Sequence, residues 1–343
     1  MNPLKDMVLI SPNKIINKNP VIVAVIKNEV SREDMKDVLR CKDSVAEALL
    51  QRGYKPKTLY LREGTFKSPA ILVEKILKLN PSCVFNLFEG FFDDSQKEAD
   101  FVFVLEESGI PFTGNSSFTL KTALDKVRTK GILNLNNILT PQGFFVKNIK
   151  DLNDKQISFP LFIKPCFEDA SVGIDENALI EGNKELYEVI NKKLKEFPKG
   201  LIIEEFIGGK EYSAGFLGDF PYELLGISVL DYNKHKDFLP FLTYSSKWVQ
   251  ESEEFRVLLP SIEERIEPSL KKKILNLAVK AAKILKCKSH FRVDLREKQK
   301  ELYVIDINPN PDINEDSGFI KQAYHKGYSY PDIIEKILLT SLQ

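Results

Sequence analysis

At 343 residues the chain is longer than a single hydrophobic core usually sustains, so we expect two or three domains. Lys plus Arg and Asp plus Glu each number 49, so the formal net charge is zero and no overall basic surface points to a nucleic-acid partner. The four cysteines, Cys41, Cys83, Cys166 and Cys287, stand far apart without a C-x-x-C pair, which argues against a zinc site and against a disulfide framework.

The first segment, MNPLKDMVLISPNKIINKNP, lacks the apolar core and the small-residue cleavage site of a signal peptide. No later apolar run approaches membrane-spanning length. We therefore expect a soluble cytoplasmic protein that binds no membrane.

Strand and helix patterns alternate over residues 21–108. VIVAVI (21–26) predicts a buried strand, and Asp43 can cap a helix that Gly53 ends. TLYLRE, a helical PAILVEKILKL, CVFNLF and a helix from about Gln96 to Ser108 follow. This alternation predicts a parallel sheet covered on both sides, in a first domain of residues 1–120.

Beyond the Gly/Pro turn GIPFTG (109–114), SSFTLKTALDKVRTKGILNL shows the periodicity of one helix. Strands then dominate in GFFVK, FPLFIKP and GLIIEEFI, with a Lys/Glu-rich helix near residues 184–196. More strands follow from residue 211, then a long helix at 269–287, two strands and a final helix after Pro331. The class therefore changes from α/β to α+β along the chain.

SHFRVDLREKQKELYVIDINPN predicts two strands joined by a charged turn. Strand alternation puts Val304, Asp306 and Asn308 on one face, and symmetric pairing puts Arg292 and Asp294 beside Asp306 and Val304. The resulting oxygen cluster suits Mg²⁺, and the arginine could neutralise charge on a phosphoryl group. The alternative is a solvated outer face of an antiparallel hairpin.

Two further segments are typical of nucleotide binding. FPLFIKPCFEDASVGI places Lys164 at the end of an apolar strand before the small residues Ala170, Ser171 and Gly173, where backbone N–H groups could approach phosphates. In LIIEEFIGGKEYS a strand meets Glu204 and Glu205, and its linker could offer backbone groups to an adenine edge. A solvated lysine and an ordinary surface hairpin are the alternatives.

Taken together and in order, these segments resemble the ATP-grasp superfamily, and within it the D-alanine:D-alanine ligase family. The matching pieces are GIPFTG, TALDKVRTK, FPLFIKP, SVGI, IIEEFIGGKEYS, TYSSKW, FRVDLR, IDINPNPDI and SG. The resemblance implies three domains: an N-terminal Rossmann-like domain (1–120), a central ATP-grasp subdomain (121–206) and a C-terminal ATP-grasp subdomain with the metal site (207–343). Family members are often dimers, so the resemblance also implies a homodimer.

The resemblance also implies roles for individual residues. ATP would contact Lys126, Lys164, Glu204, Glu205, Phe206, Ile207 and Glu211. Two Mg²⁺ ions, which Mn²⁺ could replace, would be held by Asp294, Asp306 and Asn308. Arg292 would stabilise the transition state, Ser171 belongs to the phosphate loop, and Lys247 would reach the phosphate from a lid at residues 234–248. A solvated loop lysine is the alternative for Lys247.

The substrate half departs from the family pattern. Glu29 is a candidate for the substrate ammonium contact, but the glycines expected beside it are absent. Glu89 replaces a histidine, Ala170 a serine, Trp248 a tyrosine and Asp312 a glycine, whereas Ser317 matches a serine that would bind a substrate carboxylate. Asp312 would favour a cationic amine, unless it turns outward and caps the following turn through Asn314.

We therefore expect an ADP-forming, ATP- and Mg²⁺-dependent ligase that joins a small-molecule carboxylate to an amine through an acyl phosphate, with substrates other than two D-alanines favoured. The alternative enzyme is a D-alanine:D-alanine ligase of peptidoglycan synthesis. A nucleotide-binding regulatory protein without turnover is a third reading, which the joint presence of Arg292, Asp294, Asp306 and Asn308 disfavours.

Overall fold

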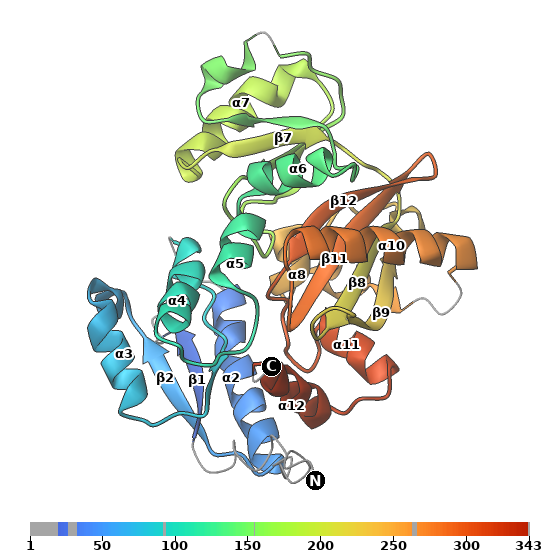
Figure 1. The fold of residues 1–343 in the computed structure, drawn as a ribbon. Coiled ribbons are helices and arrows are strands. Elements are labelled where there is room, and N and C mark those ends of the chain that lie inside the picture. The colour runs from blue at the N-terminus through green and yellow to red at the C-terminus, as the bar shows by residue number, and fades with distance from the viewer. Residues whose placement is uncertain (1–19, 27–32, 92–93, 154, 263–265, 342–343) are drawn as a thin grey trace, which may run out of the picture.

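The computed structural model describes residues 20–26, 33–91, 94–153, 155–262 and 266–341. Three sheets follow one another along this part of the chain, each accompanied by helices (Figure 1). No described helix combines the length and the apolar character needed to cross a membrane. All four cysteines are free and buried.

The first sheet is parallel, as predicted, with the strand order β2-β1-β3. Its strands are β1 (Val21–Ile26), β2 (Pro56–Leu61) and β3 (Cys83–Asn86), and its helices are α2 (Glu33–Gln51), α3 (Pro69–Leu77) and α4 (Gln96–Glu107). The side chains of residues 21–25 on central β1 are fully buried. Such a continuous apolar run suits a central strand that is covered on both faces.

The start of α2 differs from the prediction. The helix begins at Glu33, so Asp43 lies inside it and pairs with Lys42 at 2.6 Å instead of capping it. The charged residues of EDMKDVLRCKDS hide the apolar spacing of this first half, which is why the sequence pattern placed the start too late. The predicted end holds, since Gly53 adopts φ +83° and its N–H donates to Leu50 O.

The single helix predicted after GIPFTG is two helices, α5 (Ser117–Leu124) and α6 (Lys126–Leu135). Asp125 separates them in an extended conformation, and its carboxylate accepts the N–H of Arg128 at 3.0 Å as the N-cap of α6. The apolar periodicity runs through the break, so the pattern alone could not show it. The break places Lys126 in the first turn of a new helix.

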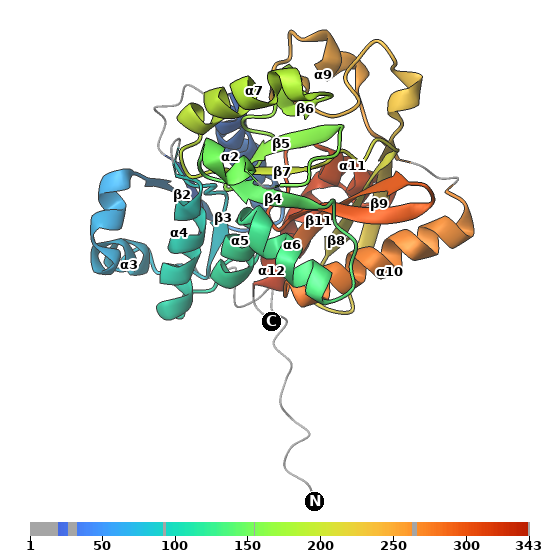
Figure 2. The same cartoon turned by 90° about the horizontal axis from the view of Figure 1, so that it is seen from above.

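The second sheet is antiparallel with the order β4-β7-β5-β6. Its strands are β4 (Gly143–Val146), β5 (Leu161–Pro165), β6 (Leu179–Ile180) and β7 (Leu201–Glu205). The helix α7 (Asn183–Glu196) lies along this sheet (Figure 2), and its Leu186 and Ile190 share a core with Ile163 and Ile203.

The third sheet is also antiparallel, with the order β10-β9-β8-β11-β12. Its strands are β8 (Glu211–Leu217), β9 (Glu223–Leu230), β10 (Ser261–Ile262), β11 (His290–Lys298) and β12 (Glu301–Asn308), and the helices α8 (Tyr244–Trp248), α9 (Glu253–Val257) and α10 (Pro268–Ile284) lie between β9 and β11 in sequence. Ala278 and Ala281 of α10 share a core with Val293 and Ile307.

The last two helices, α11 (Gly318–His325) and α12 (Tyr330–Thr340), return toward the first sheet. Ile334 and Ile337 of α12 are fully buried in the same core as Val45 and Leu49 of α2, and Figure 1 shows the two helices side by side. The hydroxyl of Tyr54 donates to Glu335 Oε1 at 2.8 Å across this contact. The first core therefore combines both ends of the described chain, while the domain boundaries at residues 120 and 206 stay predictions.

Candidate active site

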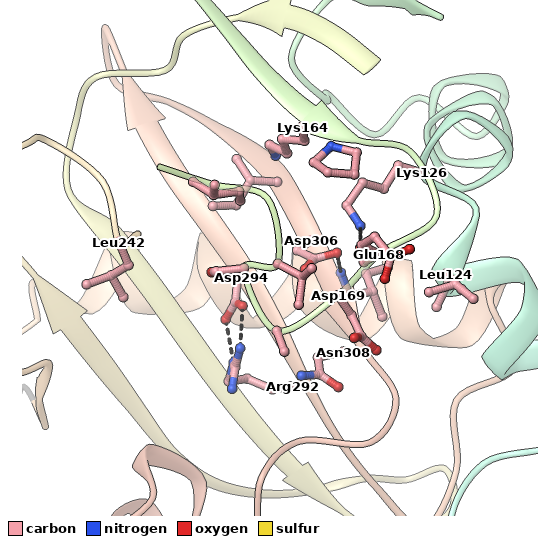
Figure 3. Close-up of a pocket in the computed structure, with 18 of the residues that line it drawn as sticks. Leu124, Lys126, Lys164, Glu168, Asp169, Leu242, Arg292, Asp294, Asp306 and Asn308 are labelled. Carbon is pink, nitrogen blue, oxygen red and sulfur yellow. Dashed lines mark hydrogen bonds and ion pairs between the residues drawn. The ribbon is translucent and has the colours of Figure 1, made fainter. Parts of the chain in front are cut away.

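One cavity gathers side chains from the second and third sheets, from α4 and from α6. It is lined by all the residues for which the sequence implied nucleotide, metal or catalytic roles: Lys126, Lys164, Ser171, Glu204, Glu205, Phe206, Ile207, Glu211, Lys247, Arg292, Asp294, Asp306 and Asn308. Figure 3 shows the lysines on one side of this cavity and the hairpin carboxylates opposite them. Segments nearly 200 residues apart therefore meet at one site.

The hairpin β11–β12 supplies the acidic side of the cavity. Asp294 lies opposite Asp306 in the strand register, and Arg292 lies opposite Asn308. The guanidinium of Arg292 binds both carboxylate oxygens of Asp294, at 2.8 and 2.9 Å (Figure 3). Burial would raise the pKa of Asp294, but Arg292, together with Ser213 and Lys247, outweighs burial and lowers that pKa, so the carboxylate stays charged.

A β-bulge changes the predicted arrangement of β12. Asp294 pairs with Asp306 but Leu295 pairs with Val304, so Ile305 is an extra residue in its strand. Val304 consequently packs in the core with Leu295 and does not share a face with Asp306, and Ile305 lines the cavity. The predicted face shared by Val304 and Asp306 was therefore wrong. The predicted pairing of Arg292 and Asp294 with Asp306 and Val304 was also wrong, because their observed partners, Asn308 and Asp306, lie two residues further along β12.

The oxygen ligands at this point fit Mg²⁺. Among the described residues no three His, Cys, Asp or Glu side chains gather as a ready-made metal cluster. Asp294, Asp306 and the amide of Asn308 supply hard oxygens from neighbouring strands, and Asn308 Oδ1 is fixed by the N–H of Asn310 at 2.9 Å. So small a protein ligand set suits an ion that keeps water and takes its other ligands from phosphate oxygens.

The opposite wall carries two lysines and a tight loop. Lys126 Nζ donates to the carbonyl of Glu168, and Lys164 Nζ lies 2.7 Å from Glu204 Oε1. In the loop that follows β5, Ala170 and Ser171 adopt left-handed backbone conformations with φ 48° and 62°. The loop therefore turns sharply at the cavity wall, next to the cationic groups.

Aromatic rings form the far end of the cavity. Phe162 lies 4.9 Å from Phe241 and 5.7 Å from Phe206 between ring centroids, and the Arg296 guanidinium stacks 5.3 Å from the Phe206 ring. Arg296 also donates to Ile207 O and to Glu211 Oε2, each at 2.9 Å. An end of the cavity lined by aromatic rings suits the apolar faces of a purine ring.

The predicted lid contacts the tight loop. Trp248 Nε1 donates to Ala170 O at 2.8 Å, and the Tyr244 N–H donates to Ile174 O at 2.9 Å. Lys247 between them lines the cavity, and burial together with nearby Arg292 lowers the pKa of its amine. Lys247 is therefore part of the cavity wall, not a solvated loop residue.

The residues predicted for substrate binding do not all lie at one place in the structure. Glu89, Trp248 and Asp312 line a second, smaller cavity, which shares Asn310 with the first. Asp312 accepts from the Asn314 N–H at 2.8 Å and from Asn314 Nδ2 at 2.9 Å, so it both lines this cavity and caps the turn. Burial raises the pKa of its carboxyl.

The other two substrate residues lie elsewhere. Ser317 is the N-cap of α11, where its hydroxyl accepts the Ile320 N–H at 3.2 Å, and it is not part of the described lining of either cavity. Glu29 lies outside the described residues.

Three residues of the site were not singled out from the sequence. Lys130 pairs with Glu204 Oε2 at 2.5 Å, Arg296 donates to Ile207 O at the aromatic end of the cavity, and Glu98 of α4 lines the cavity and accepts from Asn310 Nδ2 at 2.9 Å. Lys130 follows Lys126 by one helical turn, and Arg296 continues the alternation of Arg292 and Asp294. Both residues could therefore have been recognised from their spacing in the sequence. Glu98 could not have been recognised in this way, because its partner is 212 residues away in the sequence.

A cavity between two antiparallel sheets, with lysines on one side and hairpin carboxylates on the other, is the arrangement of the ATP-grasp class. The family model described as D-ala D-ala ligase C-terminus matches residues 136–339. The chain therefore belongs to the D-alanine–D-alanine ligase family, within the ADP-forming carbon–nitrogen ligases.

Relatives and solved structures agree with this assignment. The D-alanine–D-alanine ligase of Carboxydothermus hydrogenoformans is 29% identical over 316 residues, which cover 89% of this chain and 93% of that protein. The Bacillus anthracis D-alanine–D-alanine ligase structure with ATP aligns over 94% of this chain and 97% of its own, with TM-score 0.74 and 22% identity. The VanG D-Ala:D-Ser ligase from Enterococcus faecalis aligns over 94% and 99%, with TM-score 0.69 and 18% identity.

Proposed function

We propose that the protein is an ATP- and Mg²⁺-dependent carboxylate–amine ligase that works through an acyl phosphate. The observation that supports this most directly is that Lys126 and Lys164 share one cavity with the facing pair Asp294 and Asp306. Cations opposite a hard-oxygen site are what a nucleotide triphosphate with its metal requires. A regulatory nucleotide-binding protein would not need both Arg292 and Lys247 in the lining of this cavity.

Each part of the cavity has a role in this proposal. The Phe162, Phe206 and Phe241 rings hold the adenine, with backbone groups of Glu205 and Ile207 at its edge, and Glu211 binds the ribose. Lys126, Lys164 and the loop at Ser171 orient the phosphates. Mg²⁺ held by Asp294, Asp306 and Asn308 would neutralise charge on the phosphates.

The chemistry then needs little proton transfer by the protein in its first step. The substrate carboxylate attacks the γ-phosphorus and displaces ADP, while Arg292 and Lys247 stabilise the negative charge of the transferring phosphoryl group. The amine then attacks the acyl carbon, and phosphate leaves. The lid contact between Trp248 and Ala170 excludes water that would otherwise hydrolyse the acyl phosphate.

The substrates proposed here differ from two D-alanines. The second cavity carries Asp37, Glu89 and Asp312, and Arg40 is paired with Asp37 at 2.6 Å. An excess of carboxylates beside the acyl position repels an amino-acid carboxylate and favours a cationic amine. The substitution Asp312→Asn keeps an oxygen that can accept from Asn314 but removes the charge, so we expect it to raise the KM for the amine about tenfold. An unchanged KM would reject this assignment.

The alternative, a D-alanine:D-alanine ligase, has the support of the family and of the relatives' names. ADP release with Mg²⁺ and ATP decides between the two when D-alanine alone is compared with pooled carboxylates and amines, followed by mass spectrometry of the product. Turnover with D-alanine alone favours the alternative. Turnover that requires another carboxylate and amine supports the proposal. A protein that binds ATP but releases no ADP with any pool contradicts it.

A further inference from the structure

A buried charge triad lies at the base of the nucleotide cavity and is only partly explained by the roles given above. The carboxylate of Glu204 forms ion pairs with two lysines: Lys164 Nζ lies 2.7 Å from Oε1, and Lys130 Nζ lies 2.5 Å from Oε2. The three side chains are buried, with 3% of Glu204, 11% of Lys164 and 12% of Lys130 exposed. Lys130 is also held by the carbonyl of Pro141 at 3.0 Å.

The two lysines differ in what else they can reach. Lys164 ends β5 at the wall of the nucleotide cavity, next to Lys126 and the tight loop. Lys130 lies one turn further along α6 and contributes to a small adjoining cavity, but not to the described lining of the nucleotide cavity. Lys164 is therefore placed to contact a phosphate, and Lys130 is placed behind it.

This arrangement creates a conflict for Lys164. Its ammonium group forms a close ion pair with Glu204, and a phosphate must compete with that buried carboxylate for the same group. If Glu204 had no other cation, release of Lys164 would leave an uncompensated buried charge, which is strongly unfavourable. Lys130 removes this penalty, because it remains bound to the second oxygen of Glu204.

We propose that Lys130 is a positioning residue that neutralises Glu204 so that Lys164 can exchange from the carboxylate to a nucleotide phosphate. Burial raises the pKa of Glu204, but Lys130 and Lys164 outweigh it and lower that pKa, so the carboxylate remains a charged competitor. The inference rests on the proposed function only in taking this cavity as the nucleotide site. It concerns the phosphates, so it predicts that adenosine, which has no phosphate, binds almost unchanged.

The test measures the Kd of ATP and of adenosine by calorimetry, on the full chain with Mg²⁺ present. The variants are K130M, K130R, E204Q and the charge-balanced K130M/E204Q, with K121M on the exposed face of α5 as the matched control. We expect K130M to weaken ATP at least tenfold and adenosine less than twofold. K130R and K121M should stay within threefold of the wild type.

The double variant carries the decisive comparison. Without a charge on residue 204, no carboxylate competes with the phosphate for Lys164. K130M/E204Q should therefore bind ATP as tightly as E204Q alone. This comparison also holds if K130M alone fails to fold. The inference is overturned if K130M binds ATP like the wild type, if ATP and adenosine weaken equally, or if the double variant loses tenfold relative to E204Q. A wild type that binds no ATP at all would instead reject the proposed function.

Discussion

Asp294 and Asp306 face each other directly across the β11–β12 ladder, although Asp306 follows a bulge that shifts its strand by one residue. The bulge permits Val304 to stay in the core while Asp306 and Asn308 reach the cavity. The eight residues of this one strand thus supply side chains both to the core and to the acidic side of the cavity.

Removal of the charge at this pair should abolish metal-dependent turnover. If Asp306 is a metal ligand, as proposed above, Asp306→Asn should lower kcat for Mg²⁺-dependent ADP release at least about 100-fold, because loss of a direct ligand exceeds the effect of losing an outer-shell partner. The matched control is Glu301→Gln, at the exposed start of the same strand, which should change kcat less than twofold. Similar rates for the two variants would remove Asp306 from the metal site.

The lid contact predicts a change in accessibility. Trp248→Phe keeps an aromatic ring but loses the hydrogen bond to Ala170 O, a loss of about 1 kcal/mol. The open lid should become roughly fivefold more populated, and limited proteolysis within residues 234–248 should accelerate to the same degree. Tyr187→Phe, at an exposed position of α7, is the control. Equal cleavage rates in both variants would contradict this closed arrangement.

Glu98 should make stability depend on pH. Burial, with Asp169 nearby, raises the pKa of this carboxyl to about 8 from its ordinary value of 4.5, whereas the unfolded chain titrates near the ordinary value. Between these values the folded state binds more protons, so stability is highest at low pH and falls as pH rises. Relative to Glu98→Gln, the wild type should lose up to about 1.4 kcal/mol per pH unit, measured by urea unfolding. A difference that is constant from pH 5 to pH 8 would contradict the shift.

The joint core of α2 and α12 can be tested by a cavity. Ile334→Ala removes a fully buried side chain and should lower the free energy of unfolding by about 2–5 kcal/mol. Ile71→Ala removes the same atoms at a half-exposed position of α3 and should change it by less than about 0.5 kcal/mol. The urea midpoints of the two variants give the comparison, and equal midpoints would show that α12 adds nothing to this core.

The sequence predicted the elements that depend on local spacing and missed those that depend on a distant partner. The parallel first sheet, the lysine at the end of β5 and the alternation of Arg292 with Asp294 follow from period and residue type. The bulge at Ile305 depends on how β12 pairs with β11, and the break at Asp125 depends on the carboxylate capping a new helix where the apolar pattern continues.

For the carboxylates of the site, too, the sequence predicted residue type but not distant contacts. Replacement of a glycine by Asp312 could be read from the resemblance, but its two contacts to Asn314 and its place beside Asp37 could not. No sequence motif marks Glu98 of α4 as a cavity residue, because its position follows from how α4 packs and not from its neighbours in sequence.

The position of α12 also bears on how the protein is made. Strands β1 to β3 emerge from the ribosome early, but the helix that covers α2 is encoded some 240 residues after β3. The part of α2 that packs on α12 therefore stays uncovered until residues 330–340 have been synthesised, whereas its contacts with β1 and β2 can form earlier. Truncated or prematurely terminated chains would expose that surface permanently, which makes them natural clients for chaperones and proteases.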